Sequence, residues 1–204
     1  MKNKLLQIIL LVSLSPCLLV SLSPCLLVSL SPCLLVSQNL QFYREDIVFT
    51  LHENHIETDA VYHFVNVGEK EIKTPLFYPF PENTMELIDS IEVKNEKSGE
   101  VIPHRPGKSG IFFNIEVKAY GQASYRVFYR QKLVEKQFTY ILTSTEAWNR
   151  PLEFANFELC IPMEIHFDSL SYPPDTSYLQ KDFQHYLWKK KEFMPEKDFE
   201  VWFQ

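Results

Sequence analysis

The chain has 204 residues, of which 46% are hydrophobic, 14% aromatic and 23% charged. This composition is typical of a folded globular protein and excludes disorder as the default state. Of the charged residues, 18 of the 20 basic ones and all 26 acidic ones follow residue 37, so that part of the chain carries a net charge of −8. A net negative charge has the wrong sign for nucleic-acid binding, and we expect no nucleic-acid partner.

Residues 1–37 are predicted to be an export segment. Lys2 and Lys4 are followed by a stretch without charge up to Arg44, and an eight-residue unit, SLSPCLLV, occurs there three times, at 13–20, 21–28 and 29–36. A short basic start and a long apolar run are typical of a secretory signal. Cleavage near residue 37 is the first interpretation; an uncleaved membrane anchor and a lipid on Cys33 are the alternatives. The protein is therefore expected to be exported, as a periplasmic, cell-surface or extracellular protein that touches the membrane only through this segment if it is uncleaved.

Residues 38–204 are predicted to form a single all-β domain. Aromatic and β-branched residues alternate with polar ones in short runs that Gly, Pro and Asn separate, which is the pattern of strands with one buried face. We predict an antiparallel β-sandwich of about ten strands, with two fused sheets as the alternative. In chain order, the expected strands are 42–52, 56–67, 72–80, 87–94, 111–117, 124–134, 138–142, 155–161, 165–172, 185–190 and 199–203, with loops at 95–110 and 143–153.

The stretch 77–82, FYPFPE, ends one of these strands and opens the next turn. Pro79 and Pro81 have no N–H to donate to a neighbouring strand, so this strand is predicted to lie at a sheet edge or to leave the sheet there.

Residues 62–71 (YHFVNVGEKE) and 76–82 (LFYPFPE) together resemble the vault/inter-alpha-trypsin (VIT) type of β-domain. The resemblance covers residues 45–95 and rests on an apolar strand ending in Phe-x-Asn, an acidic turn, and a strand ending in a Pro-hydrophobic-Pro cluster. The second half is similar to uncharacterised secreted bacterial β-rich proteins through residues 193–199 (FMPEKDF). These resemblances imply a non-catalytic extracellular sandwich.

No motif in the chain predicts a catalytic residue, a metal ion or a cofactor. Residues 106–109 (PGKS) look like the end of a phosphate loop, but the required glycine is replaced by Ile102 and a strand follows, so they are predicted to be a turn. His52 and His55 are one residue too close for a helical zinc motif and are interpreted as turn histidines, although a surface metal site stays open. Cys160 is interpreted as a structural thiol.

Most aromatic residues keep strand parity and are expected in the core. Trp148 and Tyr172 lie in predicted loops and do not keep it, and we predict that Trp148, Arg150 and Tyr172 contribute to a contact surface. The first functional hypothesis is a non-catalytic module that binds an envelope or extracellular protein or glycan. The alternatives are a secreted carbohydrate-active hydrolase and a purely structural surface component.

Overall fold

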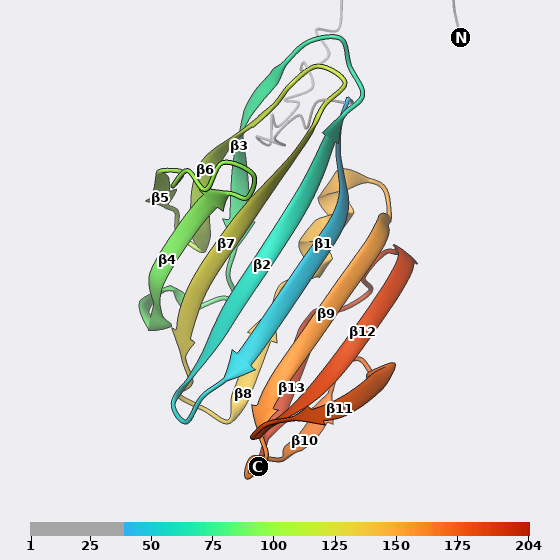
Figure 1. The fold of residues 1–204 in the computed structure, drawn as a ribbon. Coiled ribbons are helices and arrows are strands. Elements are labelled where there is room, and N and C mark those ends of the chain that lie inside the picture. Colours follow the sequence, from blue (N-terminus) through green and yellow to red (C-terminus); the bar gives the residue numbers. More distant parts are fainter. Residues whose placement is uncertain (1–38) are drawn as a thin grey trace, which may run out of the picture. The chain divides into compact units, whose positions relative to one another are not determined.

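The computed structural model describes residues 39–204, which form thirteen strands and two short 3-10 helices (Figure 1). The elements are β1 (Leu40–Leu51), β2 (His55–Asn66), β3 (Ile72–Pro79), η1 (Met85–Leu87), β4 (Ile88–Asn95), β5 (His104–Pro106), β6 (Gly110–Val117), β7 (Gln122–Lys132), β8 (Gln137–Tyr140), η2 (Thr143–Trp148), β9 (Leu152–Pro162), β10 (Phe167–Leu170), β11 (Thr176–Gln180), β12 (Phe183–Phe193) and β13 (Phe199–Phe203). The prediction of an all-β fold is confirmed.

The strands build two layers. A seven-stranded sheet, in the order β11-β12-β9-β1-β2-β7-β4, forms the first layer and lies nearest the viewer in Figure 1. The second layer consists of two three-stranded sheets, β3-β6-β5 and β10-β13-β8. All pairings within the described residues are antiparallel except that of β1 with β9, which is parallel.

The structure has two strands more than the eleven expected ranges: β5 lies in the predicted loop 95–110, and β11 lies between the expected strands 165–172 and 185–190. Every residue of both strands is exposed, so neither strand has the alternation of apolar and polar residues that would reveal it. The prediction missed both strands because their pairing, β5 to β6 and β11 to β12, buries no residue of either strand.

The core lies between the two layers and is rich in aromatic rings. Phe49 of β1 stacks on Phe199 of β13 with the ring centroids 5.0 Å apart, and it meets Phe138 of β8 edge-on at 5.3 Å. Tyr62 of β2 meets Tyr78 of β3 at 5.7 Å. The large sheet therefore packs against both small sheets, and each contact joins residues that alternate inward along their strands.

The two small sheets present edge strands toward a common seam. β3 pairs only with β6, and β8 only with β13, so neither has a second neighbour in its sheet. Pro75 and Pro79 lie in β3, where a missing N–H is tolerated because the strand is an edge. The predicted edge position of this strand is confirmed.

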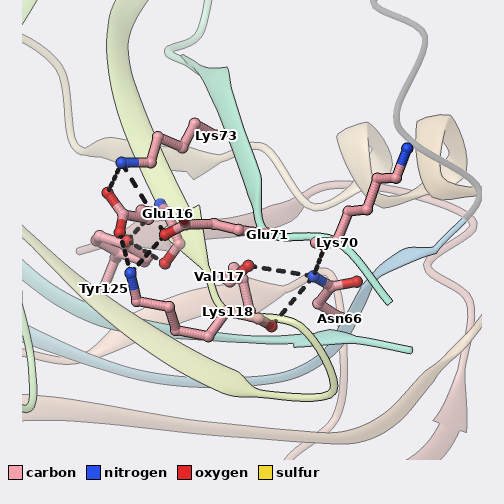
Figure 2. A network of polar contacts seen from close by, with 8 residues as sticks. All are labelled: Asn66, Lys70, Glu71, Lys73, Glu116, Val117, Lys118 and Tyr125. Atoms are coloured by element: carbon pink, nitrogen blue, oxygen red, sulfur yellow. Dashed lines mark hydrogen bonds and ion pairs between the residues drawn. The ribbon is translucent and has the colours of Figure 1, made fainter. Parts of the chain in front are cut away.

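Asn66, at the end of β2, ties the large sheet to the sheet of β3 and β6 (Figure 2). Its side chain is fully buried, and its Nδ2 donates to the backbone carbonyls of Lys70 at 2.8 Å and of Val117 and Lys118 at 3.1 Å. Its Oδ1 accepts the N–H of Gly68 at 2.9 Å. Asn66, the last residue of the Phe-x-Asn pattern, therefore joins the two layers, and both polar atoms of its side chain are hydrogen-bonded.

The predicted export segment, residues 1–37, lies outside the described residues. Within residues 39–204, neither 3-10 helix is long or apolar enough to cross a membrane. The chain ends in β13, which pairs with both β8 and β10, as the strand pattern of its last residues predicted.

Candidate functional site

A β-bulge in β1 turns Glu45 into the core. The pairing of β1 with β2 shifts by one residue between Phe42 and Arg44, so Phe42 faces inward before the shift and Glu45 faces inward after it. Glu45 lies opposite Tyr62 in the register and is only 3% exposed. Bulges commonly re-aim a side chain in this way next to functional sites.

Glu45 lines a cavity of ≈ 50 Å³ at the seam between the edge strands β3 and β8, which we call the seam cavity. Its floor is formed by residues of β1 and β2, and its sides by β3 on one hand and by β8 and η2 on the other. The lining residues are Phe42, Glu45, Tyr62, Phe64, Leu76, Phe77, Tyr78, Pro79, Tyr140, Ile141, Ser144, Thr145 and Trp148. The proline-rich stretch that the sequence singles out therefore forms one wall of the cavity.

Three tyrosine hydroxyls from the lining of the seam cavity meet one another. The hydroxyl of Tyr62 donates to that of Tyr78 at 3.0 Å and also bonds the hydroxyl of Tyr140, and the Tyr78 and Tyr140 oxygens are 3.5 Å apart. The three rings come from the large sheet and from both small sheets, so this cluster joins all three sheets at one point. Burial raises the pKa of each hydroxyl well above its ordinary value, and all three are therefore neutral at physiological pH.

Glu45 differs from these tyrosines because its Oε1 finds no hydrogen-bond partner among the described residues. Burial, with a smaller contribution from the neighbouring charge of Asp46, raises the pKa of Glu45 to about 8. The carboxyl is therefore mostly neutral at pH 7. It becomes charged when a nearby cation compensates for its lost solvation, or when the pH rises above its pKa. A buried acid without a partner, aimed into a cavity, is the most unusual group in the described chain.

The structure places the three predicted contact residues at different points. Trp148 is half-buried on the wall of the seam cavity, with its ring centroid 5.6 Å from those of Phe42 and of Phe64. Arg150 instead lines a separate surface hollow beside Phe154. Tyr172 donates its hydroxyl to the carbonyl of Lys197 at 2.8 Å. Of the three, Trp148 alone lines the seam cavity, and it does so as part of the packed core.

A Ser-His-Asp arrangement lies on the outer face of the large sheet. His63 bonds Asp46 through Nε2 and Ser124 through Nδ1, both at 2.8 Å. Partial burial acts to raise the pKa of Asp46, but hydrogen bonds from Arg44, Asn156 and His63 outweigh it and lower the pKa. Ser124 belongs to β7, an inner strand that pairs with both β2 and β4, and lies opposite His63 in the register. The arrangement serves to join β1, β2, β7 and β9.

Two clusters of side chains have ligand types that a metal ion could use. Glu158, Cys160 and His185 meet on neighbouring strands, with His185 Nδ1 lying 2.7 Å from Glu158 Oε1 and 3.3 Å from Cys160 Sγ. Burial raises the pKa of Cys160 to about 12, so the thiol is protonated and unreactive, in line with a structural role.

The second cluster joins His52 and His55 to Glu57 at the hairpin between β1 and β2. The two histidine rings stack with centroids 4.5 Å apart. His52 Nε2 lies 3.4 Å from Glu57 Oε2, and all three side chains are partly exposed. Each group in the two clusters thus has a neighbour within the cluster, unlike Glu45.

No family model and no curated protein match this chain. Among solved structures, it is similar to a "putative nutrient binding protein" from Legionella pneumophila, with a TM-score of 0.67 and 13% identity over 81% of this chain and 67% of that one. It also matches an M1 zinc metallopeptidase from Deinococcus radiodurans, with a TM-score of 0.49 and 9% identity over 80% of this chain and 42% of that one. At these identities the first likeness shows the fold alone, and the second carries no argument about function.

Proposed function

We propose that residues 38–204 form an exported, non-catalytic module that binds another component of the cell envelope or the extracellular space through the seam cavity. The observation that carries this proposal is Glu45, which is buried, lines a cavity with aromatic walls and has an Oε1 without a hydrogen-bond partner among residues 39–204. A core carboxyl without a partner destabilises the free domain, and a ligand that bonds it would recover the lost interaction.

The fold gives this proposal general support. The similar Legionella structure is that of a "putative nutrient binding protein", although the likeness extends only to the fold. A concave site with mostly apolar walls and one or two placed polar groups is the usual form of a ligand site. The seam cavity has this form.

The geometry favours binding over carbohydrate hydrolysis. Glycoside hydrolases generally need two carboxyl groups that flank the scissile bond. Glu45 is the single carboxyl among the residues that line the seam cavity. One carboxyl can bind a ligand, but it does not supply the second carboxyl that acts as nucleophile or base in these enzymes.

Blocking the mouth of the cavity tests this proposal. Ser144 is exposed and lines the cavity, so Ser144→Trp places a large ring at its entrance without disturbing the core. Ala147, on the same 3-10 helix, is exposed but outside the lining, and Ala147→Trp is the matched control. Trp148→Ala is a poorer test because Trp148 packs on Phe42 and Phe64, so its loss would also weaken the core.

The experiment is crosslinking and co-purification of the natively produced protein and its two variants. We expect the wild type and Ala147→Trp to recover the same partner in equal amount, and Ser144→Trp to lose it. Equal recovery by all three proteins would show that binding does not use the cavity. Ordered self-assembly of the purified domain, without any partner, would favour the structural alternative.

A further inference from the structure

We infer that the seam cavity receives a primary ammonium group carried on an alkyl chain, such as the end of a lysine side chain or of a small alkylamine. This inference rests on the function proposed above and names the chemical class of its ligand. It follows from the carboxyl, the aromatic walls, the size of the cavity and the apolar side that β3 forms.

The carboxyl supplies the charge that an ammonium group needs. Glu45 is 3% exposed, and its Oε1 has no hydrogen-bond partner among the described residues. A cationic N–H donor is the strongest partner for a carboxylate, because hydrogen bonds between charged groups are about twice as strong as neutral ones. Among the residues that line the seam cavity, Glu45 alone has a buried side-chain polar atom without a partner, and an ammonium group would bond it.

The walls of the cavity also favour a cation. Seven aromatic side chains line it, namely Phe42, Tyr62, Phe64, Phe77, Tyr78, Tyr140 and Trp148. Aromatic faces carry partial negative charge and attract ammonium groups, most strongly where water is excluded. The hydroxyl oxygens of Tyr62, Tyr78 and Tyr140 can accept further N–H bonds, since a hydroxyl oxygen has two lone pairs.

A metal ion fits this cavity poorly. Ca²⁺ takes six to eight oxygen ligands and Mg²⁺ requires near-octahedral oxygen coordination. The seam cavity offers a single carboxyl, and burial keeps its three tyrosine hydroxyls neutral, so they are weak ligands for a metal ion. An organic cation satisfies the same charge while it uses the aromatic walls.

The size and shape of the seam cavity restrict the class of ligand further. A volume of ≈ 50 Å³ accommodates one or two groups of about the size of water, which suits an ammonium head but not a sugar or aromatic ring. Leu76, Phe77 and Pro79 line the side formed by the edge strand β3 and give an alkyl stem an apolar surface to lie on. A straight alkylammonium group matches both parts of the cavity.

The test compares n-butylammonium with 1-butanol, its uncharged counterpart of equal length, as probes in ligand-observed NMR titrations at pH 7. We expect the wild type to bind n-butylammonium at least ~10-fold more tightly than 1-butanol, because a charged hydrogen bond adds at least that factor. Glu45→Gln should bind the two probes equally, Ser144→Trp should bind neither, and Ala147→Trp should match the wild type.

The pH dependence provides a second readout. Binding of n-butylammonium should strengthen between pH 6 and pH 8, as burial keeps Glu45 neutral at lower pH, whereas binding of 1-butanol should not change. The other titratable groups around Glu45 are Tyr62, Tyr78 and Tyr140, which stay neutral over this range, and Asp46, which stays ionised. The slope therefore reports on Glu45.

The outcomes separate this inference from the proposed function. Equal affinity for the two probes in the wild type, abolished by Ser144→Trp, would overturn the ammonium assignment and leave the cavity as a binding site. Absence of probe binding, with the native partner still lost in Ser144→Trp, would also overturn the ammonium assignment and leave the cavity as a binding site. Absence of probe binding with the partner retained in that variant would overturn both. Release of the native partner by n-butylammonium would identify a lysine of that partner as the ligand, whereas probe binding without release would identify a free amine.

Discussion

Asn66 and Glu45 are both polar residues that face the core from neighbouring strands, and their surroundings are opposite. The amide of Asn66 bonds three carbonyls and one N–H, so every polar atom of its side chain has a partner. Glu45 is equally buried, but its Oε1 has no partner among the described residues and its pKa is raised to about 8. The comparison separates a buried polar group that holds the fold together from one that the fold tolerates at a cost.

The largest expected effect is on the pH dependence of stability. An unfolded chain ionises Glu45 near pH 4.5, while the folded protein keeps it neutral up to about pH 8, so the unfolded state binds fewer protons between these values. The contribution of Glu45 to the free energy of unfolding is therefore fully present below pH 4.5 and is lost as the pH rises to about 8. At ~1.4 kcal/mol per pKa unit, this loss is on the order of 5 kcal/mol.

Glu45→Gln should remove this loss. We expect the variant to match the wild type at pH 4 and to be more stable at pH 9, because an amide cannot ionise. Urea unfolding of both proteins at pH 4, 7 and 9 provides the measurement. Parallel pH profiles for the two proteins would mean that Glu45 is solvated or paired in the folded state.

The second largest effect is expected for substitution of Asn66. Asn66→Ala leaves the carbonyls of Lys70, Val117 and Lys118 and the N–H of Gly68 without their side-chain partner. We expect a loss of ~4 kcal/mol in the free energy of unfolding, since several buried groups lose their bonds together. Asn114→Ala, at an exposed position of β6, is the control and should be nearly neutral in the same urea titration.

A smaller effect is expected where the tyrosine hydroxyls bond one another. Tyr78→Phe removes one acceptor from the hydroxyl of Tyr62, which keeps its bond to Tyr140. We expect a loss of ~1 kcal/mol in thermal or urea unfolding. Tyr120→Phe, at an exposed turn, should leave stability unchanged. A loss equal to that of Asn66→Ala would show that the three hydroxyls act as a single network.

The smallest effect is expected in the exposed ion pairs next to Asn66 (Figure 2). Glu116 lies 2.8 Å from the Nζ atoms of both Lys73 and Lys118, and all three side chains are solvent-exposed. Because exposed ion pairs are screened by water and salt, Glu116→Gln should leave the unfolding midpoint within experimental error. A marked decrease in the unfolding midpoint that disappears in high salt would show that these charges support the hydrogen bonds of Asn66.

Much of the fold is predictable from the sequence because strand alternation is a local property. Ile47, Phe49 and Leu51 alternate in the chain and are all buried, and the prolines of β3 predict the edge strand that the structure contains. The parallel pairing of β1 with β9 could not be predicted, because it joins residues about a hundred positions apart and leaves no local pattern.

The candidate site was predicted only in part. Trp148 was expected at an exposed contact surface, and the structure places it in the core wall of the seam cavity. Glu45 was not predicted, although the sequence contains a signal for the bulge. Phe42 and Ile47 are five positions apart, so they can face the same side of one strand only if an extra residue between them breaks the alternation. That break alone does not say that an acid enters a cavity.

By itself, the sequence determined which segments are strands, which face of each strand is apolar and where a strand must lie at an edge, because these properties depend on residues close together in the chain. The tertiary structure decided that the second layer is divided between two sheets, that their edge strands β3 and β8 meet over β1 and β2, and that Glu45 lies at this seam. The physical reason is that the burial and the missing hydrogen bond of Glu45 are set by residues from four strands and a 3-10 helix, which only folding brings together.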